Sequence, residues 1–299
     1  MQKKKREMTA WTADLLCLVV AAVWGSGFIA SQLAIDANMS AALIMALRFT
    51  LASAAMLAVC VPRLKHIRPR DLKMGALAGL FLFGAFYTQI VGQQYTTVSH
   101  CAFLTATNVV MVPFIVWAVS RRRPAAKTFV LTATTLVGIG VLSITPGSFA
   151  LTFNFGDAMT LVCALLFALH ITSLGWATQG ADVMLINLIQ LSTAAVISLA
   201  VFLLTDVGAV SRADLGMGLP AVAYLGLFST CLCYFLQTLA QKHTTPAQAG
   251  VLLSTEGLFG SVFSVLLGME RLTANLVAGG LILLVSIILM EVLPSGKKG

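Results

Sequence analysis

The 299-residue chain is 59% hydrophobic and 10% charged, with a formal net charge of +8 and a mean hydropathy of +0.94. Soluble domains carry roughly 25% charged residues, so this composition excludes an ordinary soluble protein. The positive charge does not indicate a nucleic-acid partner, because the basic residues gather in loops and tails between long apolar runs.

These apolar runs repeatedly reach the ~20 residues with which a helix crosses a bilayer. They are continuous rather than alternating, which favours helices over a transmembrane barrel. The sequence therefore predicts an all-α polytopic membrane protein. In chain order, we expect ten transmembrane helices at residues 11–35, 40–61, 72–94, 98–119, 127–145, 155–176, 183–205, 218–241, 246–268 and 272–293.

The basic residues orient these spans. With the N-terminus inside, the inner loops and tails collect nearly all Lys and Arg residues, whereas the outer side collects only Arg212 and Arg271. The positive-inside rule then places both termini in the cytoplasm, in a multi-pass protein of the inner (plasma) membrane. The basic run Lys3–Arg6 resembles a signal peptide, but the apolar run Trp11–Ile35 is too long for one, so we expect an uncleaved first span.

The chain repeats itself. When Tyr95 is aligned with His243, Thr107-Asn108 falls on Thr255-Glu256, and Asp14 with the residues after it aligns separately with Asp157. Residues 1–145 and 146–299 therefore form two repeats of five spans each. Because five is odd, the second repeat enters the membrane from the opposite face. Inverted repeats are typical of secondary transporters, whose substrate site lies near the midplane between them.

Two polar residues reach that midplane. Glu256 lies about ten residues into its span from the inside, or ~15 Å at the rise of an α-helix. Asn108 lies equally deep in its own span from the outside. Because the hydrocarbon core is ~30 Å thick, we expect both side chains at one level near its centre.

Several motifs resemble those of one family. Trp24-Gly25-Ser26-Gly27-Phe28 is similar to a W-G-x-x-F signature, Leu47-Arg48-Phe49 to an R-F pair, and Ser254–Gly257 with Leu267–Thr273 to LEP…LGERLT. Their order and spacing resemble the EamA family of the drug/metabolite transporter (DMT) superfamily over nearly the whole chain. The resemblance implies ten helices in two inverted EamA repeats and export of small metabolites, prominently amino acids.

Glu256 is the strongest candidate for a functional residue, since an ionisable residue at mid-membrane is costly unless it is paired or hydrated. It would bind an ammonium group or carry a proton; the alternative is a glutamate hydrogen-bonded in a helix interface. His170 is a second proton-coupling candidate, with a satisfied core histidine as the alternative. The expected substrate-binding residues are Trp24, Phe28, Tyr87, Thr107, Asn108, His170, Tyr234, Glu256 and Phe259.

Other polar residues within the spans have a structural interpretation of equal or greater weight. We interpret Arg48 as a packing anchor that snorkels or caps backbone carbonyls, with a clamp for a substrate carboxylate as the alternative. The amides of Gln89, Gln93 and Gln237 can bond across helices, which joins helices as often as it forms a site. Phe86 is one of the aromatic residues that could line a cavity.

The sequence contains no Walker A, zinc-ligand, Gly-x-Ser-x-Gly or Rossmann pattern, so we expect no enzyme, cofactor or metal. We therefore expect a gradient-driven carrier whose partners are a small-molecule solute and the lipid bilayer. We expect export of amino acids, apolar or aromatic ones above all, by alternating access. The alternatives are a phosphorylated-sugar or nucleotide-sugar exchanger, a multidrug efflux carrier, a passive channel, and a membrane-embedded enzyme with Glu256 and His170 as acid and base. The oligomeric state is left open.

Overall fold

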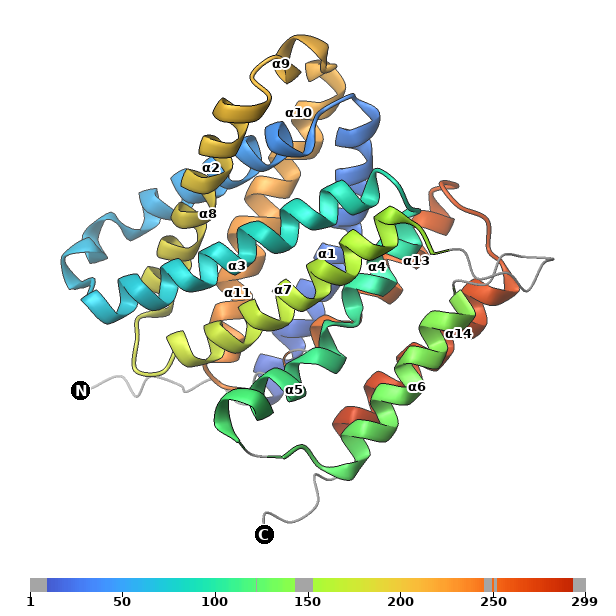
Figure 1. Ribbon diagram of the computed structural model, residues 1–299. Coiled ribbons are helices and arrows are strands. Elements are labelled where there is room, and N and C mark those ends of the chain that lie inside the picture. Colours follow the sequence, from blue (N-terminus) through green and yellow to red (C-terminus); the bar gives the residue numbers. More distant parts are fainter. Residues whose placement is uncertain (1–9, 122, 143–152, 245–248, 250–251, 293–299) are drawn as a thin grey trace.

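The structure is a computed structural model that describes residues 10–121, 123–142, 153–244, 249 and 252–292, and all regular structure in them is helical (Figure 1). η1 is a 3₁₀-helix and η2 a π-helix. The helices are α1 (Ala10–Asp36), α2 (Ala41–Cys60), η1 (Val61–His66), α3 (Pro69–Gln93), α4 (Val98–Ala106), α5 (Asn108–Ser120), α6 (Ala126–Leu142), α7 (Phe155–Ala177), α8 (Val183–Thr205), α9 (Ala209–Arg212), α10 (Leu215–Tyr224), η2 (Leu225–Leu232), α11 (Cys233–Gln241), α13 (Glu256–Leu266) and α14 (Ala274–Val292).

Seven helical stretches of the described residues are long and apolar enough to cross a membrane. They are Trp11–Asp36, Ala41–His66, Pro69–Gln93, Val98–Ser120, Phe155–Ala177, Val183–Thr205 and Leu215–Gln241. Glu256–Leu266 and Ala274–Ser286 are shorter apolar helices. The predicted spans 127–145, 246–268 and 272–293 extend into residues outside the described part. Large apolar side chains such as Val196 and Leu204 are exposed, as lipid contact requires. The prediction of an all-helical, multi-pass membrane protein is confirmed.

The helix contacts show an internal symmetry. In the order of the two repeats, α1 corresponds to α7, α2 to α8, α3 to α10–η2–α11, α4–α5 to α13, and α6 to α14. α3 packs on α7, and correspondingly α10–η2–α11 packs on α1. α13 packs on α1, and correspondingly α4 and α5 pack on α7. Two further pairs, α2 with α8 and α6 with α14, each consist of two counterparts. α6 and α14 lie side by side at one edge (Figure 1).

The repeat is also visible in the backbone at two helix breaks. Thr107 separates α4 from α5, and its amide and hydroxyl both donate to the carbonyl of Leu104, at 3.2 and 2.7 Å. Thr255 precedes α13 and makes the same two bonds to Leu252, at 3.2 and 2.7 Å. The backbone angles agree as well, with φ −66°, ψ −8° at Thr107 and φ −65°, ψ −9° at Thr255. A threonine hydroxyl that competes for a helix carbonyl favours such a break.

A glycine lets α1 and α13 approach closely. A Cβ atom on Gly25 would lie 2.8 Å from the backbone nitrogen of Gly260 and would overlap Phe259. Since α1 also carries Trp24 and Phe28, this contact brings both aromatic residues close to Glu256, the first residue of α13.

Candidate functional site

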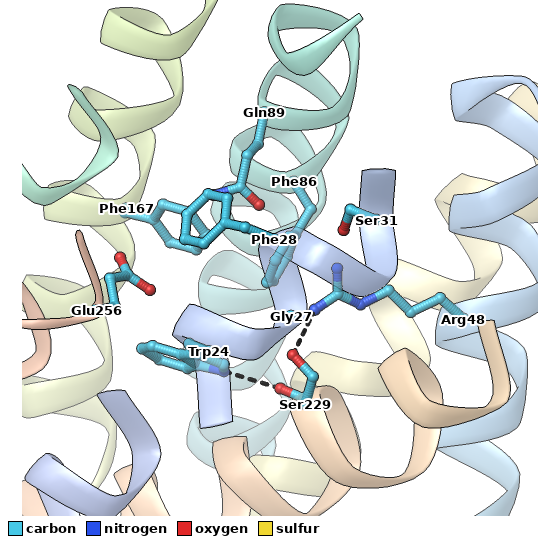
Figure 2. A pocket seen from close by; sticks show the side chains of 10 residues that line it. All are labelled: Trp24, Gly27, Phe28, Ser31, Arg48, Phe86, Gln89, Phe167, Ser229 and Glu256. Carbon is cyan, nitrogen blue, oxygen red and sulfur yellow. Dashed lines mark hydrogen bonds between the residues drawn. The ribbon is translucent and has the colours of Figure 1, made fainter. Parts of the chain in front are cut away.

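A small pocket lies where α1, α2, α3, α7, η2 and α13 meet (Figure 2). The space that a ligand can enter is only about 10 Å³, room for about one water molecule, and all of the residues around it are buried. They are Trp24, Gly27, Phe28, Ser31, Arg48, Phe86, Gln89, Phe167, Ser229 and Glu256. Because both repeats supply residues, the pocket lies between them, where transporters built from inverted repeats bind substrate.

Arg48 forms one wall of the pocket. It comes from α2 and is 1% exposed. Its Nε donates to Thr230 Oγ1 at 2.5 Å, and its Nη2 donates to Ser229 Oγ at 3.4 Å. The guanidinium carbon lies 3.8 Å from the centroid of the Phe86 ring, a cation–π contact. None of the ion pairs within the described residues includes Arg48, so its charge faces the pocket with neutral neighbours.

This placement corrects one part of the sequence-based interpretation of Arg48, namely that it snorkels or caps backbone carbonyls. A snorkelling side chain reaches solvent, and an anchor that caps the backbone bonds to carbonyls. Arg48 is instead buried and donates to two hydroxyl groups. Both hydroxyls belong to η2, whose π-helical turn carries Ser229 and Thr230 next to each other. π-Helical turns occur frequently at functional sites.

Glu256 forms the opposite wall. In Figure 2 its carboxylate and the Arg48 guanidinium lie on opposite sides of the pocket, with aromatic rings between them. Glu256 is 6% exposed, and none of the hydrogen bonds or ion pairs found within the described residues engages its carboxylate. It is the first residue of α13, where the helix dipole favours negative charge. A buried carboxylate in this position gains from a cation or a proton supplied by a ligand.

Four aromatic side chains surround the space between the two charged groups. Trp24 and Phe28 come from α1, Phe86 from α3 and Phe167 from α7. Trp24 Nε1 donates to the carbonyl of Ser229 at 2.8 Å, which satisfies its buried indole. Phe86 and Phe167 meet edge to face with ring centroids 5.1 Å apart. The lining thus offers an apolar surface and groups of both charges, and a small solute can enter only when the surrounding helices move apart.

The structure brings together three of the predicted binding residues in the pocket, namely Trp24, Phe28 and Glu256. Tyr234 lies directly behind them, with its ring centroid 5.1 Å from Trp24 and 5.9 Å from Phe86. His170 lies behind Tyr234, 5.5 Å between ring centroids, and its Nε2 is 2.9 Å from Gln190 Oε1. His170, the second proton-coupling candidate, therefore does not line the pocket and is separated from it by Tyr234.

The other predicted binding residues lie elsewhere. Thr107 and Asn108 are buried at the break between α4 and α5. Tyr87 is half-buried and its ring packs on Phe83, with centroids 5.6 Å apart. Phe259, also half-buried, stacks on Phe263 at 6.2 Å. Neither aromatic side chain lines the pocket.

Several lining residues were not among the predicted binding residues. The sequence presents Phe86 as a residue that could line a cavity and Gln89 as one that can join helices. The sequence does carry a signal for Phe167, because the alignment of Asp14 with Asp157 gives Phe167 the same position in its repeat as Trp24. Ser31 and Ser229 carry none, because small hydroxyl residues are common throughout membrane helices.

Comparison with known proteins agrees with this arrangement. Residues 11–144 and 154–292 each match the model of the EamA-like transporter family. The chain belongs to this family. The two matched stretches reproduce the repeat found in the helix contacts, and EamA is part of the DMT superfamily, as the motifs indicated.

Two similar proteins support the assignment. An uncharacterized transporter of Archaeoglobus fulgidus is 29% identical over 283 residues, which cover 93% of this chain and 85% of the archaeal protein. A solved crystal structure of another protein has a TM-score of 0.71 at 16% identity, covering 96% of this chain and 97% of that chain. At this identity the structural likeness shows the shared fold alone. This EamA-family chain is thus a membrane protein of a transporter family.

Proposed function

We propose that this EamA-family protein is a secondary transporter of the inner membrane that exports amino acids with apolar or aromatic side chains by alternating access. It has ten spans in two inverted repeats, 1–145 and 146–299, with both termini cytoplasmic. The symmetric helix contacts and the equivalent breaks at Thr107 and Thr255 support the two repeats, and the odd number of spans proposed for each supports the inversion. The small number of basic residues on the proposed outer side supports the orientation. The outward direction rests on the family resemblance.

The observation that carries the substrate class is the pair of opposite charges in one buried pocket. A zwitterionic amino acid has one carboxylate for Arg48, one ammonium for Glu256, and an apolar side chain for the rings of Trp24, Phe28, Phe86 and Phe167. Guanidinium–carboxylate bonding supplies both energy and orientation. The substrate thus neutralises two charges whose burial is costly without partners.

The same charges disfavour two alternative substrates. A phosphorylated sugar brings two negative charges to Arg48 and meets repulsion from Glu256. A cationic drug pairs with Glu256 but leaves Arg48 buried beside a second cation. A membrane-embedded enzyme would need Glu256 and His170 to act together on one substrate. The structure disfavours this alternative as well, because Tyr234 lies between the pocket and His170.

Counterflow in proteoliposomes tests this function. Vesicles loaded with unlabelled phenylalanine are diluted into a trace of labelled phenylalanine, with empty liposomes and the Glu256→Gln variant in parallel. A carrier produces a transient accumulation of label, since exchange through the occupied site is faster than net flux, whereas a passive channel does not. Folded protein that shows counterflow of a sugar phosphate or a cationic dye, and none of phenylalanine, leucine or tryptophan, would refute the amino-acid proposal.

A further inference from the structure

Two helices carry the same pattern of polar residues. Extending the alignment of Tyr95 with His243 back along the chain places Phe86, Gln89 and Gln93 of α3 on Tyr234, Gln237 and Gln241 of α11. The three positions are three and four residues apart, so each set lies along one face of its helix. We call Phe86-Gln89-Gln93 the α3 ladder and Tyr234-Gln237-Gln241 the α11 ladder.

The far ends of the two ladders make equivalent hydrogen bonds. Gln93 Nε2 donates to the backbone carbonyl of Phe28 in α1 at 2.8 Å. Gln241 Nε2 donates to the backbone carbonyl of Ile171 in α7 at 3.2 Å. Phe28 and Ile171 occupy the same position when Asp14 is aligned with Asp157. The last glutamine of each ladder therefore donates the same hydrogen bond to the first helix of its repeat.

The near ends of the ladders meet at the pocket. Phe86 lines the pocket and contacts its counterpart Tyr234 edge to face, with ring centroids 5.9 Å apart. In the proposed topology α3 runs outward and α11 runs inward. The α3 ladder thus leads from the pocket toward the outer face, and the α11 ladder toward the cytoplasm.

The α11 ladder is rich in polar atoms without partners. Within the described residues, Tyr234 OH, both amide atoms of Gln237 and Gln241 Oε1 are buried and accept or donate no hydrogen bond, and the same holds for Nδ1 of the adjacent His170. In the α3 ladder Gln93 Oε1 also lacks a partner, but the middle glutamines of the two ladders differ. Gln89 Nε2 donates to Thr105 Oγ1 at 3.3 Å, but the counterpart of Thr105 is Leu253, which cannot bond to Gln237.

Buried polar groups normally have partners, and a row of exceptions calls for an explanation. We infer that the α11 ladder is the closed inner half of the substrate pathway, and that the α3 ladder is its outer half. When the inner half opens, the Gln241–Ile171 bond breaks, and water and the polar groups of the zwitterion bond to Gln237 and Tyr234. The Gln93–Phe28 bond then stays intact. When the outer half opens instead, the Gln93–Phe28 bond breaks and the Gln241–Ile171 bond stays intact. This inference rests on the proposed transport function.

Cysteine accessibility tests the pathway. Gln237→Cys and Gln241→Cys are made in a background whose six native cysteines are replaced, with Leu239→Cys as the matched control on another face of α11. Lys242→Cys, at an exposed position, is the positive control. Inside-out vesicles are treated with a membrane-impermeant cationic methanethiosulfonate. Because the reactive thiolate requires water, we expect both glutamine positions to react at least roughly tenfold faster than Leu239→Cys.

The possible results test the proposed pathway and the proposed substrate separately. Labelling needs no substrate, so fast reaction at both glutamine positions without phenylalanine transport supports the pathway and refutes the amino-acid proposal. Phenylalanine transport with both positions reacting no faster than Leu239→Cys overturns the pathway. Gln237→Leu is an independent variant: removing an unpartnered amide should raise the melting temperature and slow counterflow. A lowered melting temperature with unchanged counterflow would assign Gln237 a packing role and overturn the inference.

Discussion

The hydroxyl of Ser254 donates a 3.1 Å hydrogen bond to Oδ1 of Asn108, and this bond joins the two helix breaks of the repeats. Both residues are buried, so the bond fixes how α5 lies against the segment that leads into α13. Glu256 is two residues beyond Ser254, and its position in the pocket depends on this junction.

Breaking this bond should cost modest stability. Asn108→Leu and Ser254→Ala should each lower the free energy of unfolding by about 0.6–1.5 kcal/mol, the usual worth of such a bond in a membrane protein. The double variant should lose less than the sum of the two, because both changes remove the same bond. Thermal unfolding in detergent measures all three proteins, and strict additivity would contradict the coupling.

Arg48 should discriminate amino acids from amines. Wild-type protein should bind phenylalanine more tightly than phenethylamine, which lacks the carboxylate, by roughly 10- to 150-fold, since a bond to a charged group is worth about 1.5–3 kcal/mol. In Arg48→Gln this preference should disappear. Ligand-induced thermal shifts provide the measurement. Equal affinity of wild-type protein for both compounds would argue against a carboxylate at Arg48.

Arg48→Lys is the matched control for charge. It keeps the cation but loses the planar group that reaches Thr230 and Ser229 at once. We expect an intermediate preference for phenylalanine over phenethylamine. A full wild-type preference in this variant would show that charge alone matters.

Glu256 should couple transport to protons. Glu256→Gln keeps the shape of the side chain but removes its charge and its proton. The variant should bind phenylalanine more weakly and still exchange it at saturating concentration, while losing accumulation driven by a pH gradient. Flux in proteoliposomes with and without an imposed gradient provides the measurement. An unchanged response to the gradient in the variant would exclude Glu256 as the proton carrier.

The approach of α1 to α13 should not tolerate a side chain. Gly25→Val should abolish counterflow and lower the melting temperature, because its Cβ would overlap Phe259 and lie 2.8 Å from the nitrogen of Gly260. Gly140→Ala is the matched control, since a Cβ there meets no atom within 4 Å. The control should keep counterflow and gain slightly in stability from the helix preference of alanine. A functional Gly25→Val protein would contradict the close packing.

Reporter fusions should establish the proposed topology. Fusions after Lys73, Lys127 and Lys242 should report the cytoplasm, and fusions after Asn38 and Ala213 the outer side. The inversion depends on the odd number of spans in the first repeat. An outer-side signal at Lys127 would therefore overturn the five-plus-five arrangement.

The sequence by itself determined the class, the repeat and the most exceptional residue. In a bilayer every backbone polar group must be satisfied within the helix, so apolar runs such as Ala41–Cys60 are helical whatever packs against them. The repeat can be detected by aligning the sequence with itself. The alignment makes Thr107 equivalent to Thr255, and the backbone angles of the two residues agree. Glu256 stood out because a carboxylate within an apolar span is costly.

Only the tertiary structure decided which side chains share the pocket. Arg48 looked like an anchor, because nothing along α2 indicates which neighbour its face meets; packing against η2 and α3 turned it toward the pocket. His170 and Phe167 lie on the same helix, but only Phe167 lines the pocket, because Tyr234 lies between His170 and the pocket. Hydropathy depends on residue type and determines which segments enter the membrane. The direction in which each helix face points depends on contacts between residues far apart in the chain, such as Trp24 with Ser229.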